Sequence, residues 1–194
     1  WNDNPKKKVI SFIVQMLEGV QFLHNNGIVH LDIKPENITY NHLINNFSRR
    51  FKLIDFGFAD KEPFNNSLDK AKGTLGYVPY YYHSNNEPWF PTSYPNDWEM
   101  GKHISLFYPD DRRYSIYKSD IFSLGRVFYY LDYLIDNEFR YESTRNEWMC
   151  CRKKYKKKYD NIYINCLTLR MIDEKIENRY NIDLCFKFVY LNLR

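Results

Sequence analysis

The first hydrophobic pattern along the chain is a helical one near its start. Apolar residues recur every three or four positions after Pro5, which the first turn of a helix tolerates. Asn25-Asn26-Gly27 ends the pattern, and Gly27 suits a left-handed C-terminal cap. A second apolar face predicts that the helix is buried on more than one side. The two faces hold Ile10, Ile13, Val14, Leu17, Val20 and Leu23 on the first and Phe12, Met16 and Phe22 on the second.

Three more helices are predicted in the second half of the chain. A strongly apolar stretch begins at Lys118 and continues to Ile135, and its all-round apolarity predicts a helix through the centre of the fold. Weaker patterns predict terminal helices over 161–172 and 182–193.

Two short strands are predicted between the helical parts, over 38–40 and 51–54, around a polar turn at 45–46. Pairing of these strands would hold Asn37 and Asp55 beside each other, because each residue lies at one end of the pair. The polar residues 58–72 predict a loop. Prolines at 88, 91, 95 and 109 among many aromatic residues predict a packed, irregular insertion over 80–117. Residues 1–194 are therefore predicted to form one α+β domain that is mostly helical.

The composition is that of a globular protein, with 44% hydrophobic and 27% charged residues and a net charge of +4. Much of this charge lies in the basic run at 152–158, for which a solvated surface segment is favoured over a contact with an anionic partner. No RNA-binding motif accompanies the run, so no nucleic-acid partner is expected. No apolar run reaches the ~18 residues of a membrane-spanning helix, so no membrane span is expected either.

The four cysteines, at 150, 151, 166 and 185, have neither metal-ligand spacing nor an obvious pairing. Reduced thiols and a cytoplasmic location follow from this. The aromatic share of 19% and the recurring Asn pairs fit an AT-rich genome such as that of a large DNA virus or a protist. If the source is viral, the location would be the host cytoplasm.

Two polar segments contain the candidate functional residues. His30-Leu31-Asp32-Ile33-Lys34-Pro35-Glu36-Asn37 brings an acid, a cation and an amide together at short, fixed offsets. Asp55-Phe56-Gly57 follows and adds a second carboxylate beside a glycine. A positioned base, a cation for phosphate and oxygen ligands for a metal are the parts that phosphoryl transfer needs.

In this order the motifs resemble the C-terminal lobe of eukaryotic-type serine/threonine protein kinases. His30-Leu31-Asp32 stands where the family has His-Arg-Asp, and Asp55-Phe56-Gly57 matches its metal-binding triplet. The stretch from Gly73 to Tyr81 is similar to the end of an activation segment, and that from Ser119 to Gly125 to the start of the family's central helix. Each motif alone is weak, but five in register, with Arg179 as the late arginine, make chance improbable. The resemblance covers nearly the whole chain.

The resemblance implies a role for each matching residue, with ATP and Mg²⁺ as cofactors. Asp32 would accept or orient the proton of the substrate hydroxyl, and Lys34 would neutralise charge on the transferred phosphoryl group. Asn37 and Asp55 would hold Mg²⁺, and Thr74 would hydrogen-bond Asp32 and Lys34. A lysine two residues after the aspartate resembles Ser/Thr-specific kinases, so the implied partner is a protein substrate with Ser or Thr.

Five other residues are expected to be structural. His30 would be a packed scaffold histidine near Phe56, and Gly57 would let the backbone turn after Asp55 without a side-chain clash. The resemblance implies that Asp120 accepts backbone N–H groups of the catalytic loop. Arg179 would be the family's late structural arginine.

Several positions depart from the family pattern. Leu31 replaces the arginine that grips an activation-loop phosphate, so phosphorylation of the loop residue Ser67 is not expected to be the main switch. Pro79-Tyr80-Tyr81 replaces Ala-Pro-Glu, which leaves Arg179 without its family partner unless Glu87 or another acid of the insertion substitutes. Thr39 stands where the family places an apolar residue against the adenine.

Other kinase parts are missing from these 194 residues. The glycines form no GxGxxG loop, and no strand carries a Val-Ala-Ile-Lys-like lysine. The chain also begins with Trp1, so we expect a fragment whose N-terminal lobe lies elsewhere in the same polypeptide and which alone has negligible activity. Two alternatives stay open: a pseudokinase or scaffold module, and a small-molecule phosphotransferase of the aminoglycoside or choline type, which shares the His-x-Asp-x-x-x-x-Asn loop.

Overall fold

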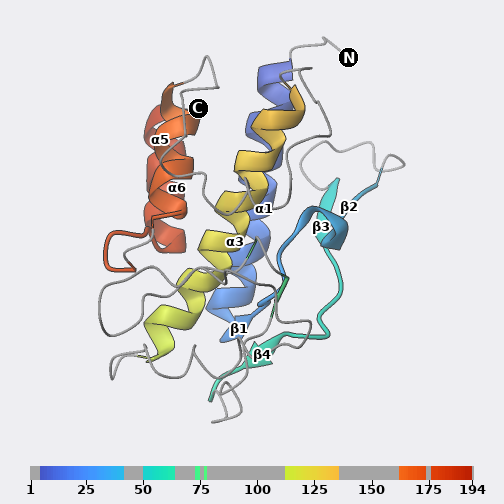
Figure 1. The fold of residues 1–194 in the computed structure, drawn as a ribbon, viewed down its shortest axis with the longest axis vertical. Coiled ribbons are helices and arrows are strands. Elements are labelled where there is room, and N and C mark those ends of the chain that lie inside the picture. Colours follow the sequence, from blue (N-terminus) through green and yellow to red (C-terminus); the bar gives the residue numbers. More distant parts are fainter. Residues whose placement is uncertain are drawn as a thin grey trace, which may run out of the picture.

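The computed structural model describes residues 5–41, 50–63, 73, 74, 77, 112–135, 162–173 and 176–193. Within these ranges the chain forms four α-helices and two small antiparallel sheets (Figure 1). The basic run at 152–158, Ser67, Glu87, Cys150, Cys151 and the Pro79-Tyr80-Tyr81 motif lie outside the described residues, as does most of the predicted insertion.

The helices are α1 (Pro5–Asn25), α3 (Arg112–Ile135), α5 (Ile162–Met171) and α6 (Ile182–Asn192). α1 and α3 run through the middle of the molecule, with α5 and α6 on one side and the strands on the other (Figure 1). None of these described helices is long and apolar enough to cross a membrane.

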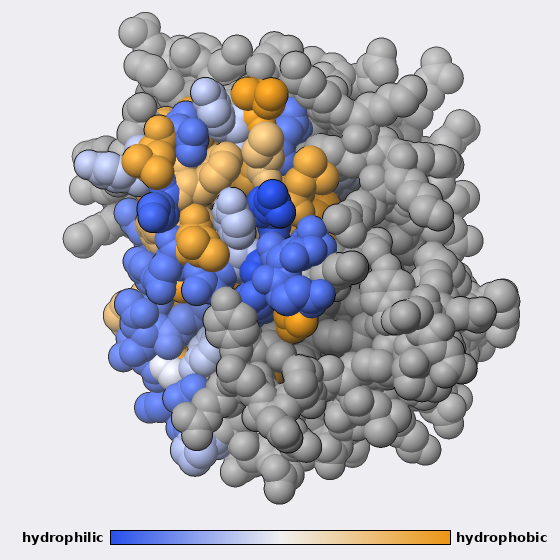
Figure 2. All heavy atoms as spheres, turned by 90° about the vertical axis from the view of Figure 1, so that its left-hand side faces the viewer, coloured by the Kyte–Doolittle hydropathy of each residue, from blue (hydrophilic) through white to orange (hydrophobic). Residues whose placement is uncertain are grey.

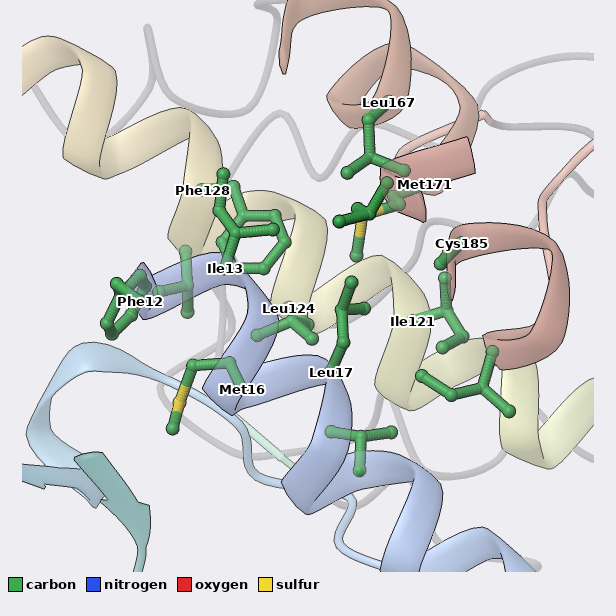
Figure 3. Close-up of a cluster of buried hydrophobic side chains, with 14 of the residues drawn as sticks. Phe12, Ile13, Met16, Leu17, Ile121, Leu124, Phe128, Leu167, Met171 and Cys185 are labelled. Atoms are coloured by element: carbon green, nitrogen blue, oxygen red, sulfur yellow. The ribbon is translucent and has the colours of Figure 1, made fainter. Parts of the chain in front are cut away.

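All four helices contribute to one hydrophobic core. Figure 3 shows side chains of α1 and α3 pointing toward those of α5 and α6. The core includes Ile13, Met16, Leu17 and Val20 of α1, Ile121, Leu124, Val127 and Phe128 of α3, Ile164, Leu167 and Met171 of α5, and Ile182, Cys185 and Val189 of α6. Burial raises the pKa of the Cys185 thiol, with a further contribution from Asp183, so this cysteine is a protonated core residue.

The strands form two pairs. β2 (Ile38–Tyr40) pairs antiparallel with β3 (Phe51–Leu53), and Ile38 lies opposite Leu53. β1 (Ile28–Val29) pairs antiparallel with β4 (Asp60–Lys61). A 3₁₀ turn, η1 (Pro35–Asn37), leads directly into β2. Both sheets follow α1 in the chain, and β3 packs against that helix.

The mostly helical α+β fold and the β2–β3 pair were predicted from the sequence, but three details were wrong. α3 begins at Arg112, so 112–117 do not belong to the predicted insertion; the last proline, Pro109, lies before them and does not interrupt the helix. β4 lies within the predicted loop 58–72 and is too short to show a period. Phe22 is 69% exposed, whereas its partners on the second face, Phe12 and Met16, are buried.

The outer face of α5 and α6 keeps hydrophobic side chains exposed. Figure 2 views this side of the molecule and shows hydrophobic residues interspersed with hydrophilic ones. The exposed apolar or aromatic residues of the two helices are Ile162, Tyr163, Leu169, Leu184, Tyr190 and Leu191. Scattered exposure of this kind is ordinary for a globular surface.

Candidate active site

The β2–β3 pair places the ends of the two polar segments beside each other. Asn37 immediately precedes β2, and Asp55 lies two residues after β3. The N–H of Ile54 donates to the carbonyl oxygen of Asn37 at 2.9 Å and extends the pairing by one step. The strand pair predicted from the sequence therefore brings Asn37 next to Ile54–Asp55, although seventeen residues separate them in the chain.

Asp32, Lys34 and Thr74 form a connected polar cluster. The Lys34 ammonium lies 2.8 Å from Oδ2 of Asp32 and donates to Oγ1 of Thr74 at 2.7 Å. The Thr74 hydroxyl in turn donates to Oδ1 of Asp32 at 2.6 Å. Each of the three side chains thus contacts the other two, as the resemblance implies, although Thr74 lies forty residues or more away in sequence.

Asn37 completes the surroundings of Asp32. Its Nδ2 donates to Oδ2 of Asp32 at 3.0 Å and to the backbone oxygen of Asp32 at 2.9 Å. Both bonds use the amide nitrogen, which fixes the orientation of the amide and leaves its Oδ1 as the group suited to a cation. Both Asp32 and Asn37 are buried.

The balance of these contacts lowers the pKa of Asp32 below its usual value of 3.8. Burial is the largest single influence and acts in the opposite direction, because it disfavours the carboxylate. Hydrogen bonds from Lys34, Thr74 and Asn37, together with the positive charge of Lys34, outweigh it. Asp32 is therefore ionised at neutral pH and is a weak base with a fixed orientation.

Asp120 on α3 holds the loop that carries Asp32. Its carboxylate accepts the backbone N–H of His30 and that of Leu31, both at 2.8 Å, and it also accepts Nε2–H of His24 at 3.0 Å. Asp120 is fully buried. Leu31 has a φ of 65°, a left-handed conformation that is costly for a leucine. The two short bonds to Asp120 stabilise this turn.

His30 joins the loop of Asp32 to the loop of Asp55. Its Nε2 lies 3.1 Å from the carbonyl oxygen of Ile54, and its Nδ1 lies 3.4 Å from the N–H of Asp32. A carbonyl can only accept and a backbone N–H can only donate, so the neutral tautomer with the proton on Nε2 satisfies both. The His30 ring also lies 4.9 Å from the Phe56 ring, as expected of a packed scaffold histidine.

Asp55 lies on the exposed side of the site. Its φ is 60°, so Asp55 is the residue of this turn that adopts the left-handed backbone conformation. Gly57, in contrast, does not have a positive φ. A Cβ at Gly57 would lie 3.2 Å from Oδ1 of Asp55, a tight contact with an exposed side chain, and the N–H of Gly57 donates to that same oxygen at 3.2 Å. The carboxylate of Asp55 is exposed beside the half-exposed Phe56.

Asp55 and Asn37 supply oxygens of the type that Mg²⁺ prefers, and the exposed side of Asp55 leaves room for phosphate oxygens and water to complete its coordination. Within the described residues, no three His, Cys, Asp or Glu side chains form a metal cage. Asp55 and Asn37 are therefore the residues of this site whose oxygens could serve as ligands for Mg²⁺.

The other sequence-predicted residues lie away from this cluster. Arg179 is buried, donates to the carbonyl oxygens of Asp173 (2.8 and 3.0 Å) and Lys118 (3.1 Å), and stacks on the Phe122 ring. These contacts tie α3 to the turn before α6, a structural role. Thr39 is exposed on β2, and its Oγ1 is 3.5 Å from the carbonyl oxygen of Lys52.

Two supporting residues were missed in the sequence. His24 gave no local signal, because its partner Asp120 lies 96 residues away. Gln15 was visible as a polar residue among the apolar positions of α1. Its Oε1 accepts the N–H of Arg50 at 2.9 Å and that of Phe51 at 3.1 Å, which anchors the start of β3 on α1.

Comparison with known proteins gives a family for the part of the chain that holds this site. Residues 3–81 match the protein kinase domain family. Smooth-muscle myosin light chain kinase of Gallus gallus is 41% identical over 73 residues, and the striated muscle preferentially expressed protein kinase of Danio rerio is 45% identical over 73 residues. These alignments cover 38% and 37% of this chain, and 4% and 2% of the relatives.

A probable serine/threonine-protein kinase of Dictyostelium discoideum is 34% identical over 125 residues. This alignment is longer, at 64% of the chain, and covers 10% of the relative. The chain thus matches a tenth or less of the length of each of these three proteins.

Proposed function

This chain carries part of a eukaryotic-type protein kinase domain, and from this premise we propose that the intact protein transfers the γ-phosphate of ATP to Ser or Thr hydroxyls of protein substrates. The observation that carries the proposal is the Asp32–Lys34–Thr74 cluster beside Asn37 and Asp55. A buried carboxylate, a cation and two oxygen ligands lie within one small region, which is what positioning and charge neutralisation in phosphoryl transfer require. The described residues would belong to the large, C-terminal lobe.

In this mechanism Asp32 orients the substrate hydroxyl toward the phosphoryl group. Its lowered pKa makes it a poor base in the ground state, which suits a loose transition state in which the hydroxyl proton is lost late. Lys34 has donors to share between Asp32, Thr74 and the transferred phosphoryl group. Thr74 keeps the carboxylate and the ammonium at their separation.

Asn37 and Asp55 would hold Mg²⁺ with the nucleotide. When bound, the metal neutralises charge on the phosphate oxygens. The amide of Asn37 is oriented for this by its two bonds to Asp32, so the same residue links the metal site to the residue that orients the substrate. His30 links the two loops from the other side through Ile54 and Asp32.

The test is a phosphorylation assay with the full-length protein, Mg²⁺-ATP and three peptide pools that offer only Ser, only Thr or only Tyr. We expect incorporation into the Ser and Thr pools and its loss in Asp32→Asn, which keeps the shape of the side chain and removes the charge. Glu36→Gln is a matched control, because this neighbouring carboxylate is exposed and outside the cluster. Transfer to Tyr alone, or full activity of Asp32→Asn, would contradict the proposal.

A second candidate function is a pseudokinase or scaffold module. Leu31 favours this candidate, because an uncharged side chain at this position cannot form charge-assisted hydrogen bonds with an activating phosphate. Nucleotide binding without transfer to any pool would support this reading. Transfer to a small alcohol such as choline in place of a peptide would instead support the small-molecule phosphotransferase.

A further inference from the structure

We propose that Ser123 of α3 is a positioning residue that holds Thr74 against Asp32 and Lys34. This inference rests on the proposed function, because it assigns Ser123 a part in the same site. Ser123 is buried in α3 and touches none of the reacting groups itself. It acts through the short backbone turn that carries Thr74.

The connection consists of three consecutive hydrogen bonds. The Ser123 hydroxyl donates to the carbonyl oxygen of Tyr77 at 2.7 Å. The N–H of Tyr77 donates to the carbonyl oxygen of Thr74 at 3.0 Å, which closes a turn between the two residues. The Thr74 hydroxyl then donates to Oδ1 of Asp32 at 2.6 Å. A shift of Tyr77 away from α3 would therefore move the turn and the hydroxyl that orients Asp32.

Ser123 also lies in register with the residue that supports the other half of the cluster. Asp120 precedes it by three positions on α3, and residues at this spacing share a helix face. Asp120 fixes the loop of Asp32 through His30 and Leu31, and Ser123 fixes the turn of Thr74 through Tyr77. One turn of a core helix thus fixes the positions of both residues of the Asp32–Thr74 hydrogen bond. Because the helix is more rigid than the two backbone segments it holds, it determines their relative position.

The hydroxyl of Ser123 has one proton and two acceptors. Besides Tyr77, the carbonyl oxygen of Ser119 lies 3.0 Å away, in the preceding turn of the same helix. A helical serine commonly donates to such a carbonyl. When the turn of Thr74 moves away, the Ser123 hydroxyl keeps a partner within α3, and no buried donor is left unsatisfied.

The kinetic test compares Ser123→Ala with the wild-type full-length protein. Loss of one buried hydrogen bond predicts a fall of roughly two- to tenfold in kcat, with the KM for ATP unchanged. Ser123→Thr keeps the hydroxyl and is expected to restore most of the activity. Thr168→Val is the matched control: it also removes a buried helical hydroxyl, one that has no hydrogen-bond partner among the described residues, and it should leave kcat unchanged.

A double-mutant cycle separates positioning from a general structural effect. If Ser123 acts through Thr74, adding Ser123→Ala to Thr74→Ala lowers kcat no further. Independent, multiplicative losses in the double variant would overturn the link to Thr74.

Hydrogen–deuterium exchange gives a readout that needs no activity. In Ser123→Ala we expect faster exchange in the peptide that contains the Tyr77 amide, with exchange in α1 unchanged and Thr168→Val identical to wild type. Unchanged exchange at Tyr77 would overturn the proposal for Ser123. A wild-type protein that phosphorylates nothing would overturn the proposed function only, because the exchange result still decides whether Ser123 holds the turn.

Discussion

At the scale of single residues, the side chains around Asp32 determine the orientation and the protonation of its carboxylate. Thr74 occupies one of its oxygens, and Lys34 and Asn37 share the other. A carboxylate held in this way has little freedom to rotate and little tendency to take up a proton. It is suited to orienting a hydroxyl at neutral pH, and the same contacts make it a stabilising group of the fold.

The lowered pKa of Asp32 predicts how stability responds to acid. Since the folded-state pKa lies below 3.8, ionised Asp32 stabilises the fold fully above about pH 5, and this contribution is lost as the pH falls below 3.8 through the folded value. We therefore expect the difference in unfolding free energy between wild type and Asp32→Asn to be constant at neutral pH and to shrink in acid. Urea unfolding at a series of pH values measures it. A difference that grows in acid would contradict the prediction.

The chemical groups of the site could be predicted from the sequence, because Asp32, Lys34 and Asn37 lie within six residues and their offsets are informative. Their supports could not. His24 and Ser123 act through partners that are far away in the chain, and no local pattern marks such a pair. The left-handed backbone at Leu31 was equally hidden, since leucine rarely adopts it, and aspartate adopts it too seldom for Asp55 to be predicted.

At the scale of elements, the packing of α3 on α5 depends on one glycine. A Cβ at Gly125 would lie 2.7 Å from Cβ of Met171 and 2.8 Å from Cγ2 of Ile172, both closer than real side chains approach. The two helices are thus closer at this point than any residue with a side chain permits. Gly19 of α1 is a contrasting case, because its nearest neighbour would be Cδ1 of Leu53 at an ordinary 3.8 Å.

These two helical glycines make a matched pair of stability tests. Gly125→Ala should lower the free energy of unfolding by about 1–3 kcal/mol, because α5 must move to admit the methyl group. Gly19→Ala should raise it by up to about 1 kcal/mol, since the site has room and alanine favours a helix. Chemical denaturation of both variants measures the two changes. Equal effects at the two positions would mean that packing at Gly125 is not the cause.

Element types were easier to predict than element boundaries. The apolar periods of α1, α5 and α6 located these helices to within one or two residues. The start of α3 was misplaced because the proline-rich stretch before Arg112 suggested that the irregular region extended further. The pairing of β4 with β1 involves two residues on each strand, a length at which alternation carries no information.

At the scale of the whole molecule, Asp120 links three separate parts of the fold. It belongs to α3, accepts His24 from the end of α1 and fixes the backbone of His30 and Leu31. All these contacts are made at a fully buried carboxylate. Removing the charge of Asp120 is therefore expected to lower the stability of the fold and to loosen the loop of Asp32 at the same time.

Asp120→Asn tests this link. An amide group offers one oxygen where the carboxylate offers two, so at least one buried backbone N–H loses its acceptor. We expect a loss of roughly 2–4 kcal/mol in unfolding free energy. His24→Ala should cost less, because both backbone bonds to Asp120 remain. Thermal or urea unfolding of the two variants decides the order, and a larger loss in His24→Ala would show that the backbone bonds are not the main contribution.

The dependence of the Leu31 turn on Asp120 also bears on the order in which the protein folds. The two residues are separated by 89 positions, and closing so long a loop is slow compared with forming a local helix or hairpin. A nascent chain that has emerged only as far as the β2–β3 hairpin already contains Asp32, Lys34 and Asn37. It lacks the acceptor that makes the left-handed turn favourable. We therefore expect the loop of Asp32 to take its final shape only once α3 has been synthesised and Asp120 can accept the N–H groups of His30 and Leu31.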